Sequence, residues 1–446
     1  MGFWRVAVQE RSFHVPGLKE KIAQRSAHVV VSGVGYVGLP LAMEFARTGF
    51  SVTGLDTDAE KIHALNRGES YVRDVPSSEL AAVVGAGRLR GTTHAGVLGE
   101  ADAVVICVPT PLSQTREPDI HHIVAATEEV ARYQHPGMLV VLESTTYPGT
   151  TAEVLVPKLG ARHTVGEDVF VAYSPQRADP GNAEYGPRNT PKVRAGATPA
   201  CLDMALARYG TIIEKLVPVT STGTAEMVKL LENTFRAVNV GLVNEIAIMS
   251  RRLGIDPFEV IRAAATKPFG FMPFYPGPGL GGHCIPLDPL YLSWKLERLD
   301  YRARFIELAD SVNGAMPEYV VGRVIDALND RGKPVRGSNV LIYGVAYKRD
   351  VADVRESPAF GIIFGLTQRG AHVAYMDPLV PELRGADVAL TSVDPASAFS
   401  AYDVVVIVTD HSALDRTRLL AQASLIVDTR DALGGTPGSR AHVHGL

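Results

Sequence analysis

The sequence has few cysteines and no long apolar segment. Its 446 residues include only three cysteines, Cys107, Cys201 and Cys284, which lie far apart and lack metal-ligand spacing. An odd and scattered set of this kind excludes a disulfide framework and speaks against a metal site. Apolar runs such as 103–108 and 404–408 are much shorter than the roughly 20 residues that a membrane helix needs. We therefore expect a protein with no metal, no disulfide and no membrane span.

The sequence also lacks a large excess of either positive or negative charge. Lys and Arg number 44 against 48 for Asp and Glu, a formal net charge of -4, and no dense basic block occurs. This excludes an obvious partner among nucleic acids or anionic membranes, and favours a small-molecule substrate. Residues 1–11 mix charged and apolar side chains without the order of a secretory signal, so we expect a cytoplasmic protein. At roughly 150 residues per domain, the length predicts about three globular domains.

The first half of the chain alternates between strand-like and helix-like segments. Short β-branched apolar runs alternate with helical patterns such as Leu39–Thr48 from Ala27 to about Val219. This rhythm predicts one mostly parallel sheet covered by helices. The predicted strands are His28–Ser32, Ser51–Leu55, Ala103–Val108, Met138–Leu142 and Val169–Ala172.

The middle of the chain has the period of a helix instead. Apolar residues recur at spacings of three and four across Thr222–Leu253, which predicts one long helix ended by Gly254. Asp256 is placed to cap a second helix, Phe258–Ala265, and a Gly/Pro-rich loop follows over 267–289. After a helical stretch at 305–328 the α/β alternation returns, with strands Val340–Tyr343, His372–Tyr375, Val404–Val408 and Leu425–Val427 around a helix Pro358–Gln368.

We therefore predict an α/β protein with two Rossmann-like, doubly wound domains joined by a long central helix. The predicted divisions are an N-terminal extension, 1–26, a first α/β domain, 27–221, a central helical region, 222–317, and a second α/β domain, 318–446. The two α/β domains share a pattern and not their residues, so the repetition is architectural only.

A glycine-rich turn follows the first predicted strand. Gly33, Gly35 and Gly38 form a GxGxxG pattern between a strand and a helix, the context that a dinucleotide fingerprint requires. Asp56 lies 18 residues after Gly38 at the end of the next strand, where a carboxylate binds ribose hydroxyls and repels a 2′-phosphate. The pattern predicts NAD rather than NADP, the alternative being a plain turn with a capping Asp. The second α/β domain has Gly344 but no GxGxxG, so it should bind another ligand.

Cys284 is the thiol best placed for chemistry. It ends the segment Gly277–Cys284, where glycines permit close approach of a ligand to the backbone. Asp288 is expected to cap a helix that starts next to it, and a helix N-terminus lowers the pKa of a nearby thiol. The alternative is a small buried apolar residue, which suits Cys107 and Cys201 better.

Three further sites have both a chemical and a plain structural interpretation. Lys229 and Asn233 share one face of the long helix. They either stabilise an oxyanion as a pair or are ordinary surface residues. Thr145 follows a strand at its carboxyl end, where it holds a ligand hydroxyl or simply caps a turn. The segment Tyr347–Ser357 carries basic residues before a helix, as an anion site suited to a diphosphate or as a solvated loop.

Taken together, these segments resemble the nucleotide-sugar 6-dehydrogenase family, which comprises the UDP-glucose, GDP-mannose and UDP-N-acetylhexosamine dehydrogenases. The resemblance covers about residues 27–431 and implies a four-electron, NAD-dependent oxidation of a sugar C6 alcohol to a carboxylate. Its motifs are GVGYVGLP at Gly33, VPTP at Val108, ESTTYPGT at Glu143, SPQR at Ser174, EMVKLLENTFRAVN at Glu226, GPGLGGHCIPLDP at Gly277, YKRDVADVRESP at Tyr347 and VDTR at Val427.

The resemblance also implies roles for individual residues. Cys284 would be the nucleophile, Lys229 and Asn233 the oxyanion stabilisers, and Asp288 and Thr145 would handle water, protons or the substrate hydroxyl, with Gln176 also in the catalytic set. The implied cofactor-binding residues are Gly33, Gly35, Tyr36, Val37, Gly38, Asp56, Pro109, Thr110, Glu143 and Thr145. The implied substrate-binding residues are Arg177, Lys229, Asn233, Tyr275, Gly277, Gly279, Tyr347, Lys348, Arg355 and Arg430. The long helix would form the core of a homodimer interface.

Gln176 departs from the family pattern. Relatives usually carry Glu at this position, which is thought to assist thioester hydrolysis as a base, whereas an amide cannot accept a proton at neutral pH. We expect Gln176→Glu to speed a rate-limiting hydrolysis, and equal turnover of the two proteins would contradict this expectation.

The substrate is less sharply specified than the reaction. The segments Thr266–Gly277 and Gly68–Val75 look most like the UDP-N-acetylglucosamine branch, while UDP-glucose and TDP-glucose in a secondary-metabolite pathway stay open. Two other classes remain as alternatives. A two-electron hydroxyacid-type dehydrogenase would not need Cys284, and a non-catalytic NAD-binding protein is suggested only by Gln176.

Overall fold

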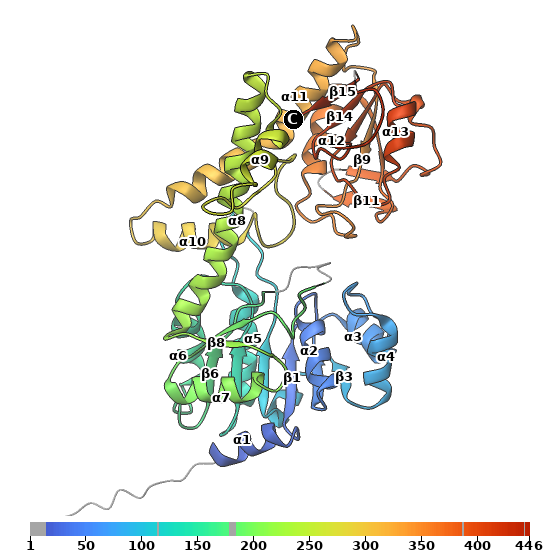
Figure 1. Cartoon of the computed structure of the whole chain (residues 1–446). Coiled ribbons are helices and arrows are strands. Elements are labelled where there is room, and N and C mark those ends of the chain that lie inside the picture. The colour runs from blue at the N-terminus through green and yellow to red at the C-terminus, as the bar shows by residue number, and fades with distance from the viewer. Residues whose placement is uncertain (1–14, 114–115, 178–183, 386–387, 441) are drawn as a thin grey trace, which may run out of the picture. The chain divides into compact units, whose positions relative to one another are not determined.

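The computed structural model describes residues 15–113, 116–177, 184–385, 388–440 and 442–446 (Figure 1). Contacts divide the chain into two compact units, one ending at Leu231 and one from Glu232 to Leu446. The long helix α8 (Thr222–Arg252) runs through the boundary.

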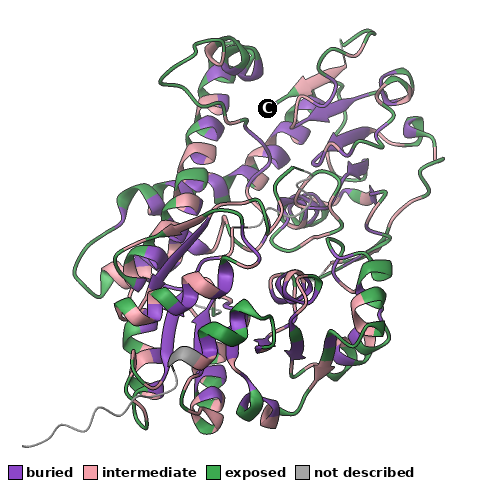
Figure 2. Ribbon diagram, turned by 60° about the horizontal axis from the view of Figure 1, so that its bottom comes forward, coloured by how far each residue is buried: buried purple, intermediate pink, exposed green. Residues whose placement is uncertain are grey.

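An eight-stranded sheet forms the centre of the first unit. The strand order is β3-β2-β1-β4-β5-β6-β7-β8, and all pairs are parallel except β6 with β7. Central strands are apolar on both faces because helices cover both sides, and Figure 2 shows them as buried. The strands are β1 (His28–Ser32), β2 (Ser51–Leu55), β3 (Leu89–Thr92), β4 (Ala103–Ile106), β5 (Leu139–Leu142), β6 (Phe170–Tyr173), β7 (Lys192–Gly196) and β8 (Leu216–Pro218).

Alternate strand residues face two separate cores in the first unit. Val29 and Val31 of β1 pack with residues of α1, α2 and α7, whereas Val30 packs with residues of α5 and α6. The helices are α1 (Val15–Ala23), α2 (Gly38–Arg47), α3 (Ala59–Asn66), α4 (Ser77–Gly85), α5 (His121–Tyr133), α6 (Val156–Leu159) and α7 (Pro199–Tyr209), with a 3-10 helix Ala95–Glu100 and a π-helical turn Thr151–Leu155.

Helix α1 lies in the segment 1–26 that is predicted as an N-terminal extension. Its residues Leu18 and Ile22 are buried in the first core, and the helix packs against α7. Residues 1–14 of the extension lie outside the described residues.

The second unit combines long helices with a five-stranded parallel sheet of order β10-β9-β13-β14-β15. Helices α11 and α12 cover one face of this sheet and α13 the other, again through alternate strand residues. The elements are α9 (Pro257–Ala264), α10 (Asp288–Glu297), α11 (Arg304–Asn329), β9 (Asn339–Tyr343), α12 (Pro358–Gln368), β10 (His372–Met376), the hairpin β11 (Glu382–Gly385) and β12 (Val388–Thr391), a 3-10 turn Phe399–Ala401, β13 (Val404–Ile407), α13 (Arg416–Gln422), β14 (Ile426–Asp428) and β15 (Val443–Gly445).

The predicted fold class is confirmed: two parallel α/β sheets occur, and a helix of 31 residues connects them in sequence. The predicted cap Asp256 accepts a hydrogen bond from Phe258 N. The predicted cap Asp288 is wrong, because α10 begins at Asp288 itself and Leu287 occupies the cap position without a side-chain bond. Within the described residues, no helix is both long and apolar enough to cross a membrane.

Candidate functional site

The turn after β1 has the backbone geometry of a phosphate cradle. Gly33 has a φ of +88°, and a Cβ there would lie 2.7 Å from the carbonyl oxygen of Cys107. A Cβ on Gly38 would lie 1.8 Å from the carbonyl oxygen of Gly33, so only glycine lets α2 start this close to the turn. A Cβ on Gly35 would meet nothing within 4 Å, which leaves open space beside the N-terminus of α2. These residues fit a dinucleotide pyrophosphate.

Asp56 is anchored at this turn. Its Oδ2 accepts a hydrogen bond from Val34 N at 3.0 Å, and its Oδ1 accepts one from Asp58 N at 3.0 Å. Tyr71, to which no motif assigned a site role, also joins this turn, because its hydroxyl donates to Val34 O at 2.8 Å. Burial, with the charge of Asp56, raises the pKa of this phenol, which therefore stays a neutral donor. The carboxylate that would bind ribose is thus fixed to the loop that would bind phosphate.

Other predicted cofactor residues gather at the same sheet edge. Pro109 and Thr110 follow β4 and Thr145 follows β5, and β1, β4 and β5 are neighbouring parallel strands. Their carboxyl ends therefore meet beside the glycine turn, where open α/β sheets bind ligands. Pro109 is exposed, Thr110 is buried and Thr145 is half-buried, and in the turn itself Tyr36 is exposed and Val37 half-buried.

Glu143 points into a buried cluster of charges. Its Oε2 accepts a hydrogen bond from Lys192 Nζ at 2.6 Å, and its Oε1 accepts one from Tyr209 OH at 2.6 Å. Arg194 Nη1 lies 3.5 Å from the same Oε1, and its guanidinium stacks on Tyr209 at 3.2 Å from the ring centroid. Arg208 is buried nearby against the ring of Phe45.

Burial disfavours the charged form of every cation in this cluster. It lowers the pKa of Lys192 to about 8 and that of Arg194 to about 10, against the opposing effect of Glu143. Burial also lowers the pKa of Arg208. Glu143 begins the ESTTYPGT motif, but no periodic or motif signal pointed to Lys192, Arg194, Arg208 or Tyr209, because these residues come from separate elements.

Gln176 is held by two lysines. Lys192 Nζ donates to its side-chain oxygen at 3.2 Å, and Lys229 Nζ donates to its backbone carbonyl at 2.7 Å. Lys229 reaches this point from α8, whose first turns are fixed by Glu226 accepting bonds from Gly149 N and Thr151 N. The predicted substrate residue Arg177 donates to Pro191 O at 2.6 Å.

In the second unit, Cys284 is exposed, whereas Cys107 and Cys201 are buried. Asp288 N donates to the carbonyl oxygen of Cys284 at 2.8 Å, so the start of α10 holds the cysteine backbone. The Asp288 carboxylate accepts a hydrogen bond from Asn233 Nδ2 of α8. Two of the predicted catalytic side chains are therefore joined directly beside the thiol loop.

The predicted substrate loop packs onto this cysteine loop. Gly282 N donates to Arg355 O at 2.9 Å, and a Cβ on Gly282 would lie 2.8 Å from Cε2 of Tyr347. The Arg355 guanidinium forms a bidentate ion pair with Asp353. Burial, followed by the charge of Arg355, lowers the pKa of His283 next to the cysteine.

Arg430 and Gly277, two of the implied substrate-binding residues, lie next to each other. A Cβ on Gly277 would lie 2.4 Å from Arg430 Nη1, and Arg430 Nε donates to Val408 O at 3.0 Å. Gly277 N donates to the side chain of Asn244 on α8. Gly279 is buried and Tyr275 is exposed in the same loop.

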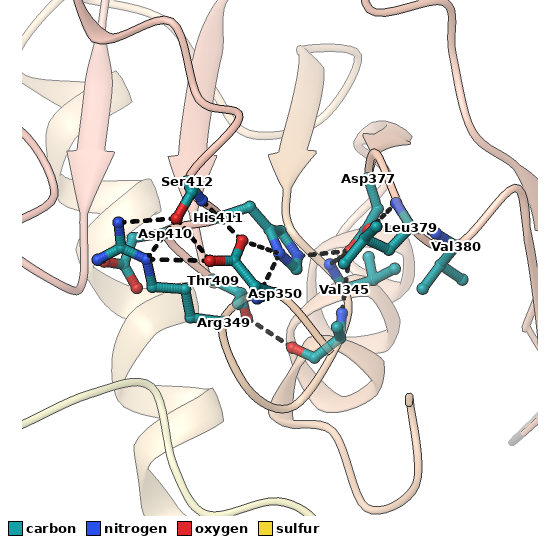
Figure 3. A network of polar contacts seen from close by, with 11 residues as sticks. Val345, Arg349, Asp350, Asp377, Leu379, Val380, Thr409, Asp410, His411 and Ser412 are labelled. Atoms are coloured by element: carbon teal, nitrogen blue, oxygen red, sulfur yellow. Dashed lines mark hydrogen bonds and ion pairs between the residues drawn. The ribbon is translucent and has the colours of Figure 1, made fainter. Parts of the chain in front are cut away.

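A buried His–Asp network fixes the loop that carries the half-buried Lys348 (Figure 3). Asp350 N donates to Nδ1 of His411 at 3.0 Å, so Nε2 carries the proton and faces Asp377 Oδ2 at 3.1 Å. Asp377 also accepts bonds from Val345 N and Ala346 N. Its hydrogen bonds outweigh the opposing effect of burial and hold the pKa of Asp377 below its usual value.

Comparison with known proteins places these features in one family. Models of the UDP-glucose/GDP-mannose dehydrogenase family match its NAD binding domain at residues 27–213, its central domain at 223–315 and its UDP binding domain at 341–435. A UDP-N-acetyl-D-glucosamine 6-dehydrogenase from Pseudomonas aeruginosa is 36% identical over 86% of this chain and 90% of its own. An NDP-N-acetyl-D-galactosaminuronic acid dehydrogenase from Ralstonia nicotianae is 34% identical over 90% of this chain and 95% of its own. The structure of a UDP-D-ManNAc dehydrogenase from Pyrococcus horikoshii superposes with a TM-score of 0.85 and 30% identity, over 94% of this chain and 99% of that one.

Proposed function

The chain belongs to the UDP-glucose/GDP-mannose dehydrogenase family and is an NAD-dependent nucleotide-sugar dehydrogenase, and from this premise we propose that it oxidises the C6 alcohol of a UDP-N-acetylhexosamine to a carboxylate. UDP-N-acetylglucosamine is the favoured substrate, with UDP-N-acetylglucosaminuronate as the product. The observation that carries the proposal is the exposed thiol of Cys284 in a loop held by Asp288, which is itself bonded to Asn233.

The chemistry proceeds through covalent capture on Cys284. Oxidation of the alcohol gives an aldehyde, and the thiol adds to its carbon to form a thiohemiacetal. Loss of a second hydride leaves a thioester, which water cleaves to the carboxylate and the free thiol. Bound NAD+ would supply the hydride acceptor for each oxidation, so that one sugar and one water would require two NAD+. Covalent capture keeps the aldehyde on the protein between the two oxidations.

Other residues serve this sequence by binding and by charge. Lys229 and Asn233 donate hydrogen bonds to the oxyanion of each tetrahedral species. Asp288 takes up the proton of the attacking water, with its carboxylate oriented by the amide of Asn233. Lys348 and Arg430 bind the diphosphate of the substrate, supported by their place in the UDP binding domain.

The sugar class rests on the similar proteins. The descriptions of the three proteins named above contain N-acetyl-D-glucosamine, N-acetyl-D-galactosaminuronic acid and D-ManNAc, at identities of 36%, 34% and 30%. Their shared feature is the N-acetyl group, which favours this class over UDP-glucose or TDP-glucose. The choice of the glucosamine epimer rests on the likeness of Thr266–Gly277 and Gly68–Val75 to that branch.

We also propose that two copies of the chain associate through α8. Within the second unit, Phe235 is 46% exposed, Leu242 is 53% exposed and Met249 is 46% exposed, seven residues apart on the helix. Phe305 and Leu308 of α11 are also exposed. A row of large apolar side chains is typical of a protein interface, and a second copy offers the same row in return.

The test is the yield of NADH per molecule of limiting nucleotide-sugar. We expect two NADH per UDP-N-acetylglucosamine in the wild type and loss of this yield in Cys284→Ser. UDP-glucose, TDP-glucose and GDP-mannose are measured in parallel to define the sugar. A yield of one NADH that does not depend on Cys284 would refute the thioester route, and no NADH with any sugar would refute the proposal.

A further inference from the structure

Val34, in the glycine turn after β1, is fixed by three separate contacts. Its N–H donates to Oδ2 of Asp56 at 3.0 Å, and its carbonyl accepts a hydrogen bond from the hydroxyl of Tyr71 at 2.8 Å. Its side chain is buried against Gly54 of β2, where a Cβ would lie 2.7 Å from Cγ1 of Val34. The peptide groups on either side of Val34 therefore each have one fixed orientation.

The contact with Tyr71 fixes a donor as well as a carbonyl. The carbonyl of Val34 and the N–H of Gly35 belong to one peptide bond, and no cis peptide bond occurs within the described residues. In a planar trans peptide these two groups point in opposite directions. Because the carbonyl faces Tyr71, the N–H of Gly35 faces away from it.

That N–H is available to a ligand. Within the part of the chain that the structure describes, Gly35 N donates to no protein group. Gly35 is half-buried, and a Cβ on it would meet nothing within 4 Å, so a ligand has room to approach its backbone. It lies just before α2, where the helix dipole favours an anion. The N–H is therefore a donor suited to a phosphate oxygen.

Tyr71 lies in a loop that is anchored well enough to impose this orientation. The loop joins α3 to α4, and two of its residues next to Tyr71, Val72 and Val75, are buried in the core on which α2 packs. Gly68 starts the loop with a φ of +73°, and a Cβ there would lie 2.7 Å from the backbone of α4. The Tyr71 side chain packs against the same core. Since the carbonyl of Val34 can only accept, the Tyr71 hydroxyl is the donor.

We propose that Tyr71 is a positioning residue of the cofactor site: its hydroxyl fixes the carbonyl of Val34, so that the N–H of Gly35 is aimed at the pyrophosphate of NAD. Asp56, the predicted ribose ligand, holds the preceding peptide of the same turn. Each of the two side chains therefore sets the direction of one peptide. The inference rests on the binding of NAD by this family and not on the identity of the sugar.

Direct binding of NADH to the enzyme without nucleotide-sugar tests the proposal. Tyr71→Phe removes the hydroxyl and keeps the ring, and we expect the Kd for NADH, measured by its fluorescence, to rise about five- to tenfold. Displacement of NADH by ADP-ribose, which carries the pyrophosphate, should weaken by the same factor. Displacement by adenosine, which carries a ribose and no phosphate, should stay within about twofold of the wild type, because it makes no contact with the N–H of Gly35.

Tyr133→Phe is the matched control. Tyr133 of α5 is also half-buried, and its hydroxyl makes no hydrogen bond within the described residues. Its loss should leave the Kd for NADH unchanged. In turnover, Tyr71→Phe should raise KM for NAD and leave KM for the nucleotide-sugar within about twofold of the wild type. Thermal melting of both variants reports on folding.

Three results would overturn the proposal. The first is an unchanged Kd for NADH in Tyr71→Phe. The second is an equal loss of affinity for ADP-ribose and for adenosine, which would show general damage to the site. The third is an equal rise in KM for NAD and for the nucleotide-sugar. Because NADH binding is measured without a sugar, a failure of the proposed substrate is distinguished from a failure of this inference.

Discussion

At Gly282 a single methyl group would disturb the loop that carries Cys284. Its φ is +85°, and a Cβ would lie 2.8 Å from the Tyr347 ring. We expect Gly282→Ala to lower kcat by about tenfold or more, because the ring or the loop must shift and a misplaced nucleophile is slow. Turnover of the nucleotide-sugar at saturating NAD measures this effect.

Gly337 offers a matched control in the same unit. Its φ is +80°, and a Cβ there would meet nothing within 4 Å. Gly337→Ala should share the backbone strain of about 1–2 kcal/mol, visible as a lower melting temperature, and keep its activity. If the two variants have equal kcat, Tyr347 does not constrain the cysteine loop.

Among the elements, the loop after β9 depends on His411 rather than on its own residues. His411 accepts from Asp350 N and contacts Asp377, which accepts from Val345 N and Ala346 N. We expect His411→Phe to raise KM for the nucleotide-sugar about tenfold, with kcat and KM for NAD nearly unchanged. The reason is that Lys348 lies in this loop. Without the hydrogen bonds through His411 the loop must become ordered when the substrate binds, and this ordering reduces the binding free energy.

Steady-state kinetics with each substrate varied in turn measures this split. His372 is an exposed histidine at the start of β10, and His372→Phe serves as the control with expected wild-type constants. Equal changes in KM for NAD and for the sugar would show that His411 acts on stability alone.

Local patterns in the sequence predicted the elements that are long or buried. Strands β1 and β2 have the predicted bounds, since a run of β-branched apolar residues acts over neighbouring positions. Strands β3, β7, β8 and β15 and the hairpin β11–β12 were missed, because they are short and carry no run of β-branched apolar residues.

The residues of the site also fall into two groups, those that local spacing predicts and those that depend on contacts between distant parts of the sequence. The glycine turn and Asp56 follow from spacing alone, because a strand, a turn and a helix fix them. The Lys192–Glu143 pair joins residues 49 apart, and the contact of Tyr347 with Gly282 joins distant loops. Asp288 was misread as a cap because its true partner, Asn233, lies 55 residues away. Side chains that depend on tertiary neighbours leave no periodic signal in one sequence.

At the scale of the whole molecule, the two α/β sheets share one local arrangement, a glycine turn that is hydrogen-bonded to an aspartate after the neighbouring strand. In each, a glycine with positive φ follows a strand, Gly33 after β1 and Gly344 after β9. In each, an aspartate after the neighbouring strand accepts an N–H of that turn, Asp56 in the first and Asp377 in the second. Asp56 is half-buried, whereas Asp377 is buried beneath His411. At the position that Asp56 occupies in the first sheet, the carboxylate of the second sheet is therefore buried and not accessible to a ribose.

The exposed apolar row on α8, formed by Phe235, Leu242 and Met249, predicts that two whole chains associate. A homodimer would cover this row, so the wild type should have about twice the 47.8 kDa mass of one chain. Phe235→Asp combined with Leu242→Asp places two charges in that row, and burying unpaired carboxylates there costs several kcal/mol. We expect this variant to have the mass of one chain by size-exclusion chromatography with light scattering.

Phe364→Asp changes a residue of α12 that is equally exposed, at 51%, and should leave the dimer intact. A wild type with the mass of a single chain would contradict the dimer, and a dimer that survives the paired change would place its interface elsewhere than α8.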